Sequence, residues 1–490
     1  MTGTVTPSDT ALPARTPTQL CIGGLWQPAA DDRTFDVVDP GSGEIVCAVA
    51  DASPADGRRA LDAAVAAQAG FAALLPRDRQ RILLRALALL DERRDDLARV
   101  LTVESGKPLA ESLAELTSVA EWIQHFAEEA VRVHGSYQQN PGVDGRMIVT
   151  RAPIGPSVLI TPWNFPLSQA VRKLAPAIAA GCTAVVKPAK ETPLAVLAFV
   201  AILLDAGLPA GVVNVVTTSE SNAVMEPLIR SGLARKLSFT GSTSVGVKLL
   251  EQAAQEVVNC SMELGGNAPF IVFDDADLDV AVDSLLINKM WNCGQTCTSA
   301  NRIFVHSTLV DEFESRVLTR VTALVQGHGL DPAVTLGPLV NEKQVSHVQA
   351  MVDDAVARGA RLVTGGHRID RPGTFYPPTI LRDIPSTAEL MREEVFGPVI
   401  ALIPFDDEAD VIARANDTYY GLVSYVFTED LRRAVRVSEA LESGNVGLNR
   451  GTVAYAAAPF GGTKKSGLGR EGSTEGIEEF LETKFVALQL

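Results

Sequence analysis

Two thiols lie four residues apart in a stretch of small and polar residues, Asn292 to Arg302. Small neighbours allow a backbone amide and a thiol to face a substrate without obstruction. The second thiol, Cys297, is therefore a candidate nucleophile. The alternative is a buried structural thiol, because free cysteine is among the most buried residue types. This stretch alone leaves both interpretations open.

Further small and polar segments follow predicted strands elsewhere in the chain. Ligands of an open α/β sheet bind at the carboxyl ends of its strands, so such segments are candidate parts of a site. Each one alone could equally be ordinary loop structure. The segments are Thr161–Pro166 after Ile160, Lys187–Lys190 after Val186, Phe239–Ser242 after Ser238, and Met262–Asn267 ahead of a second α/β region.

The elements that position these segments follow an α/β pattern. Strands before residue 50 precede a helical region from Ser53 to about His134, which is interrupted once, at Gly106-Lys107-Pro108. Apolar strands then alternate with helices from Arg146 to about Val258, and a second such pattern runs from Phe270 to about Asn449. Continuous apolar strands separated by helices predict a doubly wound parallel sheet that is covered on both faces.

Composition narrows the functional classes. A chain of 490 residues suggests two or three domains. Its formal net charge of -16 repels phosphate backbones and anionic headgroups, which argues against nucleic acid or a membrane surface as a partner. The longest apolar run, Leu194 to Leu204, is too short to span a bilayer. Residues 1–18 are expected to form a disordered tail without signal-peptide features, and the expected location is the cytoplasm.

Metal and disulfide chemistry are not expected. The six cysteines include no CxxC pair, and no Cys/His cluster is present. The acidic stretch Asp274–Asp279 is interpreted as a helix start, because it lacks the glycine and terminal glutamate of a calcium loop. Gly467–Gly472 reads as GxGxxG, but no strong strand precedes it and too little chain follows it for a dinucleotide-binding unit.

The four segments that follow or precede predicted strands, taken together with three more segments, resemble motifs of the aldehyde dehydrogenase superfamily. The resemblance runs in the right order from about Leu20 to the C-terminus and is nearest to succinate-semialdehyde dehydrogenases. It implies a cofactor domain with a doubly wound parallel sheet, an α/β catalytic domain and a small β oligomerisation arm. The added segments are Gly294-Gln295-Thr296-Cys297, Glu394-Val395-Phe396-Gly397-Pro398 and Pro459-Phe460-Gly461-Gly462.

The resemblance assigns the catalytic roles. Cys297 would attack an aldehyde as a thiolate and form a thiohemiacetal, which hydride transfer would convert to a thioester. The side-chain amide of Asn164 and the Cys297 backbone N–H would form the oxyanion hole. Glu263 would activate the water that hydrolyses the thioester, and it could also help to deprotonate the thiol. Cys293 is a rival nucleophile, but it lies outside the Gly-Gln-x-Cys match.

The resemblance also assigns a cofactor site for NADP or NAD. Lys187 would bind the adenosine ribose, and Ser242, which follows Gly241 at a helix start, would meet the pyrophosphate. Glu394 would bind the nicotinamide ribose and Phe396 would flank the ring. Trp163, Ala189 and Leu264 lie in the same matched segments and are expected to contact the cofactor. Lys190 departs from the commonest pattern, in which a glutamate accepts from the ribose 2′-OH. A lysine there would attract a 2′-phosphate, so NADP acceptance is predicted.

The substrate is less well defined by the sequence. Arg172 follows the Trp-Asn-Phe-Pro segment as in succinate-semialdehyde dehydrogenases, where it grips the substrate carboxylate. Trp291 stands where such enzymes often have a second arginine, and it would build an apolar wall. An acid semialdehyde held by Arg172 alone and a hydrophobic or aromatic aldehyde therefore both fit. Arg172 could also be a surface charge.

Two other functional classes are disfavoured by the sequence. A CoA-acylating dehydrogenase generally lacks the glutamate base, so Glu263 counts against that class. A catalytically silent homologue is disfavoured by the joint presence of the catalytic residues. The expected assembly is a homodimer or homotetramer. The expected boundaries are 19–134 and 152–262 for the NAD(P)-binding domain, 263–450 for the catalytic domain, and 135–151 with 473–490 for the oligomerisation arm.

Overall fold

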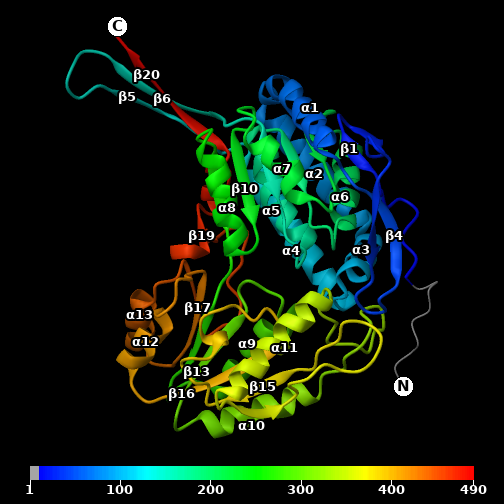
Figure 1. The fold of residues 1–490 in the computed structure, drawn as a ribbon. Coiled ribbons are helices and arrows are strands. Elements are labelled where there is room, and N and C mark those ends of the chain that lie inside the picture. The colour runs from blue at the N-terminus through cyan, green and yellow to red at the C-terminus, as the bar shows by residue number, and fades with distance from the viewer. Residues whose placement is uncertain (1–9, 490) are drawn as a thin grey trace.

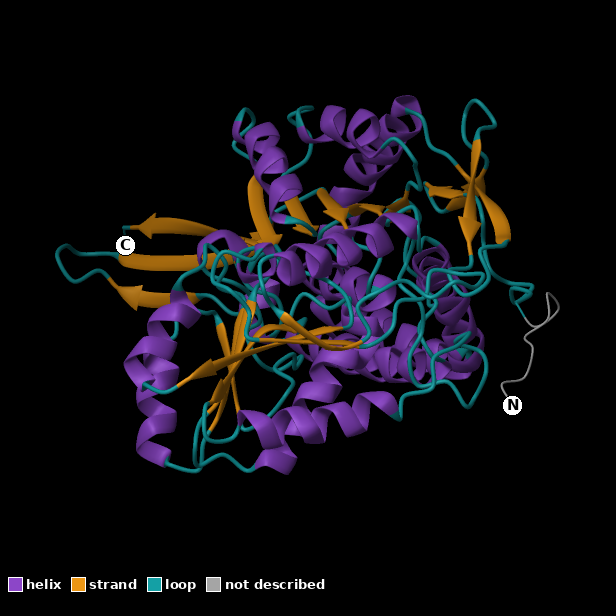
Figure 2. Ribbon diagram, turned by 60° about the horizontal axis from the view of Figure 1, so that its bottom comes forward, coloured by secondary structure: helices purple, strands orange, loops and turns teal. Residues whose placement is uncertain are grey.

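The computed structural model describes residues 10–489 and shows two α/β lobes with a projecting arm (Figures 1 and 2). The predicted tail falls partly outside these residues, since residues 1–9 are not described. Within the rest of it, Leu12 packs against the core of the first lobe. No helix within residues 10–489 is both long and apolar enough to cross a membrane.

The first lobe is built on an eight-stranded sheet of order β19-β11-β10-β7-β8-β9-β1-β2. Its five central strands, from β11 to β9, are parallel, whereas β1, β2 and β19 pair antiparallel at the two edges. The strands are β1 (Leu20–Ile22), β2 (Leu25–Gln27), β7 (Ser157–Ile160), β8 (Ala184–Lys187), β9 (Val213–Val215), β10 (Lys236–Thr240), β11 (Asn259–Glu263) and β19 (Gly467–Leu468).

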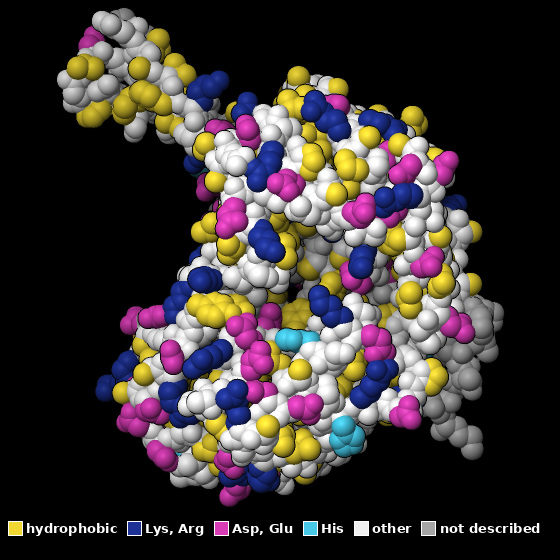
Figure 3. Space-filling model, viewed as in Figure 1, with side chains coloured by type: hydrophobic (Ala, Val, Ile, Leu, Met, Phe, Trp, Pro, Cys, Tyr) yellow, Lys and Arg dark blue, Asp and Glu magenta, His cyan; other side chains and the backbone are white. Residues whose placement is uncertain are grey.

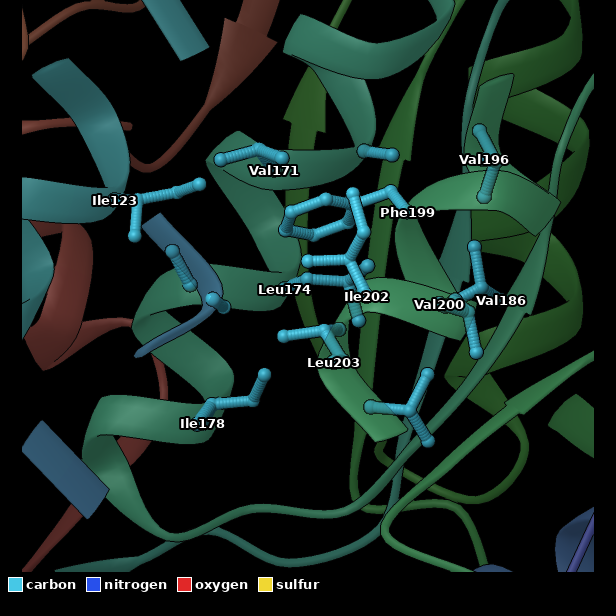
Figure 4. Close-up of a cluster of buried hydrophobic side chains, with 14 of the residues drawn as sticks. Ile123, Val171, Leu174, Ile178, Val186, Val196, Phe199, Val200, Ile202 and Leu203 are labelled. Atoms are coloured by element: carbon cyan, nitrogen blue, oxygen red, sulfur yellow. The ribbon is translucent and has the colours of Figure 1, made fainter. Parts of the chain in front are cut away.

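Helices cover this sheet, as the continuous apolar strands predict. A buried cluster from α4, α5, α6 and β8 forms its core, with Leu174 and Phe199 among the enclosed side chains (Figure 4). Two strands, β3 (Thr34–Val38) and β4 (Ile45–Ala50), form a separate ribbon. The helices are α1 (Pro54–Ala72), α2 (Pro76–Glu92), α3 (Arg94–Ser105), α4 (Leu109–Glu129), α5 (Pro166–Ala180), α6 (Leu194–Asp205), α7 (Ser221–Ile229) and α8 (Thr243–Ala254).

The N-terminal helical region differs in one respect from expectation. The predicted cap, Ser53, starts α1 through a capping box with Asp56. The region has three breaks, however, instead of the single one expected at Gly106. Leu75 is extended (φ -61°, ψ 143°) because it precedes Pro76, which disfavours the helical conformation of the residue before it. Arg93 separates α2 from α3.

The second lobe contains a seven-stranded sheet of order β14-β15-β16-β13-β12-β17-β18, in which only the β14 pairing is antiparallel among the described residues. Asp277 caps α9, which confirms that the acidic stretch is a helix start. The strands are β12 (Ala268–Val272), β13 (Ala300–His306), β14 (Arg361–Thr364), β15 (Thr379–Arg382), β16 (Val399–Phe405), β17 (Val423–Phe427) and β18 (Asn445–Leu448). The helices of this lobe are α9 (Leu278–Met290), η1 (Trp291–Gly294), α10 (Val310–Thr322), α11 (Glu342–Ala357), η2 (Glu389–Met391), α12 (Glu408–Asn416), α13 (Leu431–Ala440) and η3 (Lys464–Ser466). The last helix, α14 (Ser473–Glu478), packs against α4 and α5 of the first lobe.

The arm is a three-stranded sheet that extends away from both lobes and ends near the C-terminus (Figure 1). It consists of β5 (Ser136–Gln139), β6 (Arg146–Pro153) and β20 (Leu481–Leu488), so the predicted pairing of the late strand with the hairpin is confirmed. Tyr137 and Phe485 are 65% and 57% exposed on it. The same C-terminal segment first passes the edge of the large sheet, where β19 places Gly467 opposite Glu263.

Candidate active site

The catalytic loop leaves α9 through an unusual backbone turn. Asn292 and Cys293 have φ values of 48° and 56°, and Gly294 follows at 74°. The left-handed conformation costs energy for non-glycine residues, so the surrounding structure must hold it. The Asn292 backbone N–H donates to Glu111 Oε2 at 2.8 Å, and its side-chain Nδ2 donates to the Asn164 carbonyl at 2.8 Å. A Cβ on Gly294 would lie 2.2 Å from the Gly397 carbonyl oxygen, so only glycine fits there.

One side chain on α9 braces the chain just after Cys297. Asn288 Nδ2 donates to the Thr298 carbonyl at 3.1 Å and to the Gly451 carbonyl at 3.0 Å, and its Oδ1 accepts from the Ala300 backbone N–H. Tyr425 Oη also donates to the Thr298 carbonyl, at 2.9 Å. The nucleophile's loop is thereby tied to the 451 segment, which lies on the wall of a neighbouring cavity.

The turn sends the two thiols in different directions. Cys293 is 1% exposed and packs into the core of the second lobe. Cys297 is half-buried and lies where two cavities meet, a cleft of about 1040 Å³ and a smaller cavity of about 270 Å³. The cleft opens between the two lobes, and a hollow is visible there in Figure 3. A reactant in either cavity can therefore approach Cys297 but not Cys293.

Both thiols are protonated at neutral pH. Burial, together with the Glu394 carboxylate, raises the pKa of Cys297 to about 12, while the Arg172 guanidinium opposes the shift. Burial raises the pKa of Cys293 more strongly still, with Glu111 adding to it. Since the thiolate is the nucleophile, Cys297 needs a proton acceptor close by.

Asn164 is held rigidly at the carboxyl end of β7. Its Nδ2 donates to the Gln295 carbonyl at 2.9 Å, two residues before the nucleophile, and the residue lines the large cleft. Its carbonyl accepts from Lys107 Nζ at 2.9 Å. Lys107 is paired at 2.6 Å with Glu115, and both side chains are fully buried. Glu115 Oε1 in turn accepts from the first N–H groups of α5, such as Ser168 at 3.0 Å.

Glu263 ends β11 and faces the same cleft as Cys297. Its pKa is well above the usual range, because the carboxyl is buried and Glu471 lies close; Lys173 and Arg470 oppose the shift. Its Oε2 has no hydrogen-bond partner within the described chain. A carboxylate whose pKa is raised is a stronger base than an ordinary carboxylate, and without a fixed partner it is free to accept a proton.

The sequence motifs did not point to the ion-pair cluster beside Glu263. Lys173 Nζ lies 2.5 Å from Glu471 Oε1, and Arg172 Nη1 lies 3.8 Å from Glu471 Oε2. Glu471 lies in the GxGxxG stretch, which lacks the sequence context of a dinucleotide-binding unit. The signal that could have identified it is a glutamate beside an arginine in a matched segment, Arg470-Glu471.

Most predicted cofactor residues line the large cleft. They are Trp163, Gly241, Ser242, Leu264, Glu394 and Phe396. The rings of Trp163 and Phe396 meet edge to face, with centroids 5.3 Å apart. Ser242 precedes α8 without a side-chain cap bond, so the first N–H groups of that helix face the cleft and fit a diphosphate. Burial raises the pKa of Glu394 to about 8.

Three predicted cofactor residues do not line this cleft. Lys187 is buried and its Nζ donates to Ser221 Oγ at 2.8 Å, Ala189 is buried, and Lys190 is exposed. Helix α11 supplies cleft residues that the sequence did not suggest. Gln344 there donates to the Phe396 carbonyl at 2.9 Å, which stabilises the left-handed backbone of Phe396 (φ 54°).

The smaller cavity contains both predicted substrate residues, Arg172 and Trp291. Arg172 is 8% exposed, so it is not a surface charge. Its guanidinium lies 4.5 Å from the Trp122 ring centroid and 5.2 Å from that of Phe460. These aromatic contacts fix the orientation of the cation.

The large cleft, which has the size for a dinucleotide, meets the smaller cavity at Cys297. The Glu263 carboxyl and the Asn164 amide line the cleft near this thiol. Covalent oxidation of a carbonyl compound requires this set of groups. A model of the aldehyde dehydrogenase family matches residues 26–486. The chain belongs to this family, and the predicted fold and enzyme class are confirmed.

Individual relatives cover nearly the whole chain. The succinate-semialdehyde dehydrogenase [NADP(+)] of Escherichia coli (strain K12) is 48% identical over 96% of this chain and 98% of its own. A glutarate-semialdehyde dehydrogenase of Pseudomonas putida is also 48% identical, over the same shares of the two chains. A crystal structure described as an E. coli NADP dependent enzyme superposes with a TM-score of 0.96 at 47% identity, covering 97% of this chain and 99% of that chain.

Proposed function

We propose that the chain oxidises an acid semialdehyde to the corresponding diacid, with NADP or NAD as hydride acceptor and Cys297 as nucleophile. The observation that carries this proposal is the position of Cys297, where the large cleft meets the cavity that contains Arg172. The names of the semialdehyde dehydrogenases that are 48% identical to the chain support the same substrate class.

Cys297, Glu263 and Asn164 each have a separate role in the proposed oxidation. Glu263 takes the thiol proton, and Cys297 Sγ then attacks the aldehyde carbon to give a thiohemiacetal. Asn164 Nδ2 and the Cys297 N–H donate to the oxygen as it becomes negative. A nicotinamide cofactor in the large cleft supplies the acceptor for the hydride. Loss of the hydride leaves a thioester on Cys297. Glu263 then releases the thiol proton to solvent and deprotonates a water, which hydrolyses the thioester and releases the acid.

The decisive experiment follows reduced-cofactor formation with succinate semialdehyde. Cys297→Ala is expected to lower kcat by about 10⁴-fold or more, because it removes the group that forms the covalent intermediate. Cys293→Ser is the matched control and should keep kcat within about threefold. Native activity in Cys297→Ala would refute the proposal, and no activity of the unmodified protein with any aldehyde would favour a silent homologue.

A variant of Glu263 and the effect of added CoA distinguish a hydrolytic dehydrogenase from a CoA-acylating one. Glu263→Gln should slow the first turnover, because the amide cannot take the thiol proton, and should lower steady-state turnover further, because it cannot activate the water either. Added CoA should leave the rate of the unmodified enzyme unchanged. A rise in turnover with CoA would instead support the acylating class.

For the cofactor we favour NADP, on the basis of Lys190. Its side chain is exposed beside Glu191, which lines the large cleft, so the cation is free to pair with a 2′-phosphate. Lys190→Glu should lower kcat/KM for NADP by about tenfold or more and raise it for NAD. A large NAD advantage in the unmodified enzyme would refute this assignment.

We further propose that the arm joins subunits in a homodimer or homotetramer. Its two outer strands, β5 and β20, carry exposed apolar side chains, and such side chains are visible on the projecting part of the molecule in Figure 3. The proposed domains keep the boundaries expected from the sequence. All six cysteines are free thiols, which supports a reducing cytoplasmic location. Light scattering that shows a monomer would contradict the assembly.

A further inference from the structure

The cavity next to Cys297 combines a single cation with an aromatic lining. Arg172 is the only cation among the described residues that line it. Phe165, Trp291 and Phe460 line the same space, together with the aliphatic Val453. A short acid semialdehyde has almost no apolar surface to place against these rings.

Trp291 owes its place on the wall to the backbone turn. It ends α9 in an extended conformation (φ -54°, ψ 132°), whereas the two residues that follow are left-handed. Since Asn292 is anchored to Glu111, the turn cannot relax without losing that bond. The indole is therefore a built part of the cavity and not a side chain that happens to lie near it.

One edge of the Arg172 guanidinium faces an anion, whereas its Nε has no hydrogen-bond partner among the described residues. Glu471 lies 3.8 Å from its Nη1, and Trp122 and Phe460 pack on the guanidinium. A substrate carboxylate thus meets one partly neutralised cation instead of a pair of free arginines. Contact with the apolar wall must then supply a larger share of the substrate's binding.

The size of the cavity fits such a substrate. Its volume is about 270 Å³, whereas a protein cavity of about 150 Å³ accommodates a benzene ring. The difference leaves room for an aldehyde and an anionic group on the ring. A flexible four-carbon chain would leave much of the apolar lining unfilled.

We propose that the preferred substrate is an aldehyde with a flat, apolar body, such as an aromatic ring, between the aldehyde and an anionic group that pairs with Arg172. This inference rests on the proposed function, because it names the substrate of the same Cys297 chemistry. Trp291 is the specificity-determining residue that favours the ring over a short aliphatic chain.

The test compares kcat/KM for 4-carboxybenzaldehyde, benzaldehyde and succinate semialdehyde in the unmodified enzyme. We expect 4-carboxybenzaldehyde to exceed each of the other two by at least about tenfold, since only it uses both the wall and the cation. An equal or higher value for succinate semialdehyde would overturn the inference while leaving the proposed function intact. No turnover of any of the three, or of propanal, would overturn both.

Two variants separate the contributions of the wall and the cation. Trp291→Ala should lower kcat/KM for 4-carboxybenzaldehyde by about tenfold or more and change that for succinate semialdehyde by less than about threefold. Arg172→Leu should lower kcat/KM for 4-carboxybenzaldehyde to the level that the same variant shows with benzaldehyde, because the loss of the cation near Cys297 affects both aldehydes and only the carboxylate contact is specific to one. An equal loss on all three aldehydes in Trp291→Ala would assign Trp291 a purely structural role and overturn the inference.

Discussion

Lys107→Met should disturb both stability and catalysis, although Lys107 is expected to touch neither substrate nor cofactor. Lys107 is buried against Glu115 at 2.6 Å and donates to the Asn164 carbonyl at 2.9 Å. Methionine matches the length of the side chain but leaves the Glu115 carboxylate buried without its cation. It also removes a donor from the carbonyl of the oxyanion residue.

The magnitude follows from this burial. Removing one partner of a buried ion pair costs about 3–5 kcal/mol, because the remaining charge is uncompensated. For 490 residues that unfold as one unit, an unfolding entropy of about 2.1 cal/mol/K per residue corresponds to about 1 kcal/mol/K. Tm should therefore fall by about 3–5 °C, and by about twice that if the first lobe unfolds separately. Displacement of Asn164 should lower kcat by about 10- to 100-fold.

Thermal unfolding and steady-state kinetics of three variants test this reasoning. Arg58→Met is the matched control, because the Arg58–Asp62 pair is 57% and 52% exposed and should contribute less than about 1 kcal/mol. Adding Glu115→Gln to Lys107→Met should restore much of the lost Tm, since no buried charge is then left unpaired. A Tm within about 1 °C of the unmodified protein, together with an unchanged kcat, would refute the reasoning.

Two further predictions concern the loop and the cofactor. Asn288→Ala leaves the buried Ala300 N–H without its acceptor and frees the loop that carries Cys297, so kcat should fall by about 100-fold with little change in the cofactor KM. Tyr425→Phe is the control, because it removes a redundant donor to the same loop, and it should change kcat by less than about fivefold. Equal effects of the two variants would contradict the role of Asn288 in holding the loop. Burial lowers the pKa of Lys187 to about 8, so this side chain is a cation below about pH 8 and neutral above it. The KM for NADP should therefore rise as the pH passes about 8. Lys187→Arg, which stays charged, should abolish that rise. A KM for NADP that does not change with pH in the unmodified enzyme would count against a role of Lys187 in cofactor binding.

Local sequence signals predicted much of the fold. Apolar strands, helix-ending glycines such as Gly181 (φ 94°) and the Ser53 cap each act within a few residues of themselves, so the alternation of strands and helices could be predicted. The extra helix break before Pro76 also has a local cause in the sequence, namely the proline itself. The leucines and arginines that follow it have helical spacing, and they led to the prediction of one continuous helix.

Only those residues of the candidate site that lie in recognisable sequence motifs could be predicted. Cys297, Glu263 and Asn164 lie in matched segments, and the fold brings all three to one cleft. Contacts that support them join residues far apart in the chain, such as Lys173 with Glu471, which are 298 positions apart. No spacing rule encodes such a pair, since it depends on how the C-terminal segment returns to the first lobe.

That returning segment has a practical consequence for engineering. Within about twenty residues it passes Glu263 at β19, supplies Glu471 to the charged cluster and becomes the outer strand of the arm. Deleting this whole segment from Gly467 onward to obtain a single-subunit enzyme would therefore also remove the strand beside Glu263 and the Glu471 carboxylate. Replacing the outward-facing Phe485 and Val486 with charged residues is the gentler route, because it alters the surface of the arm and leaves the peptide path past Glu263 in place.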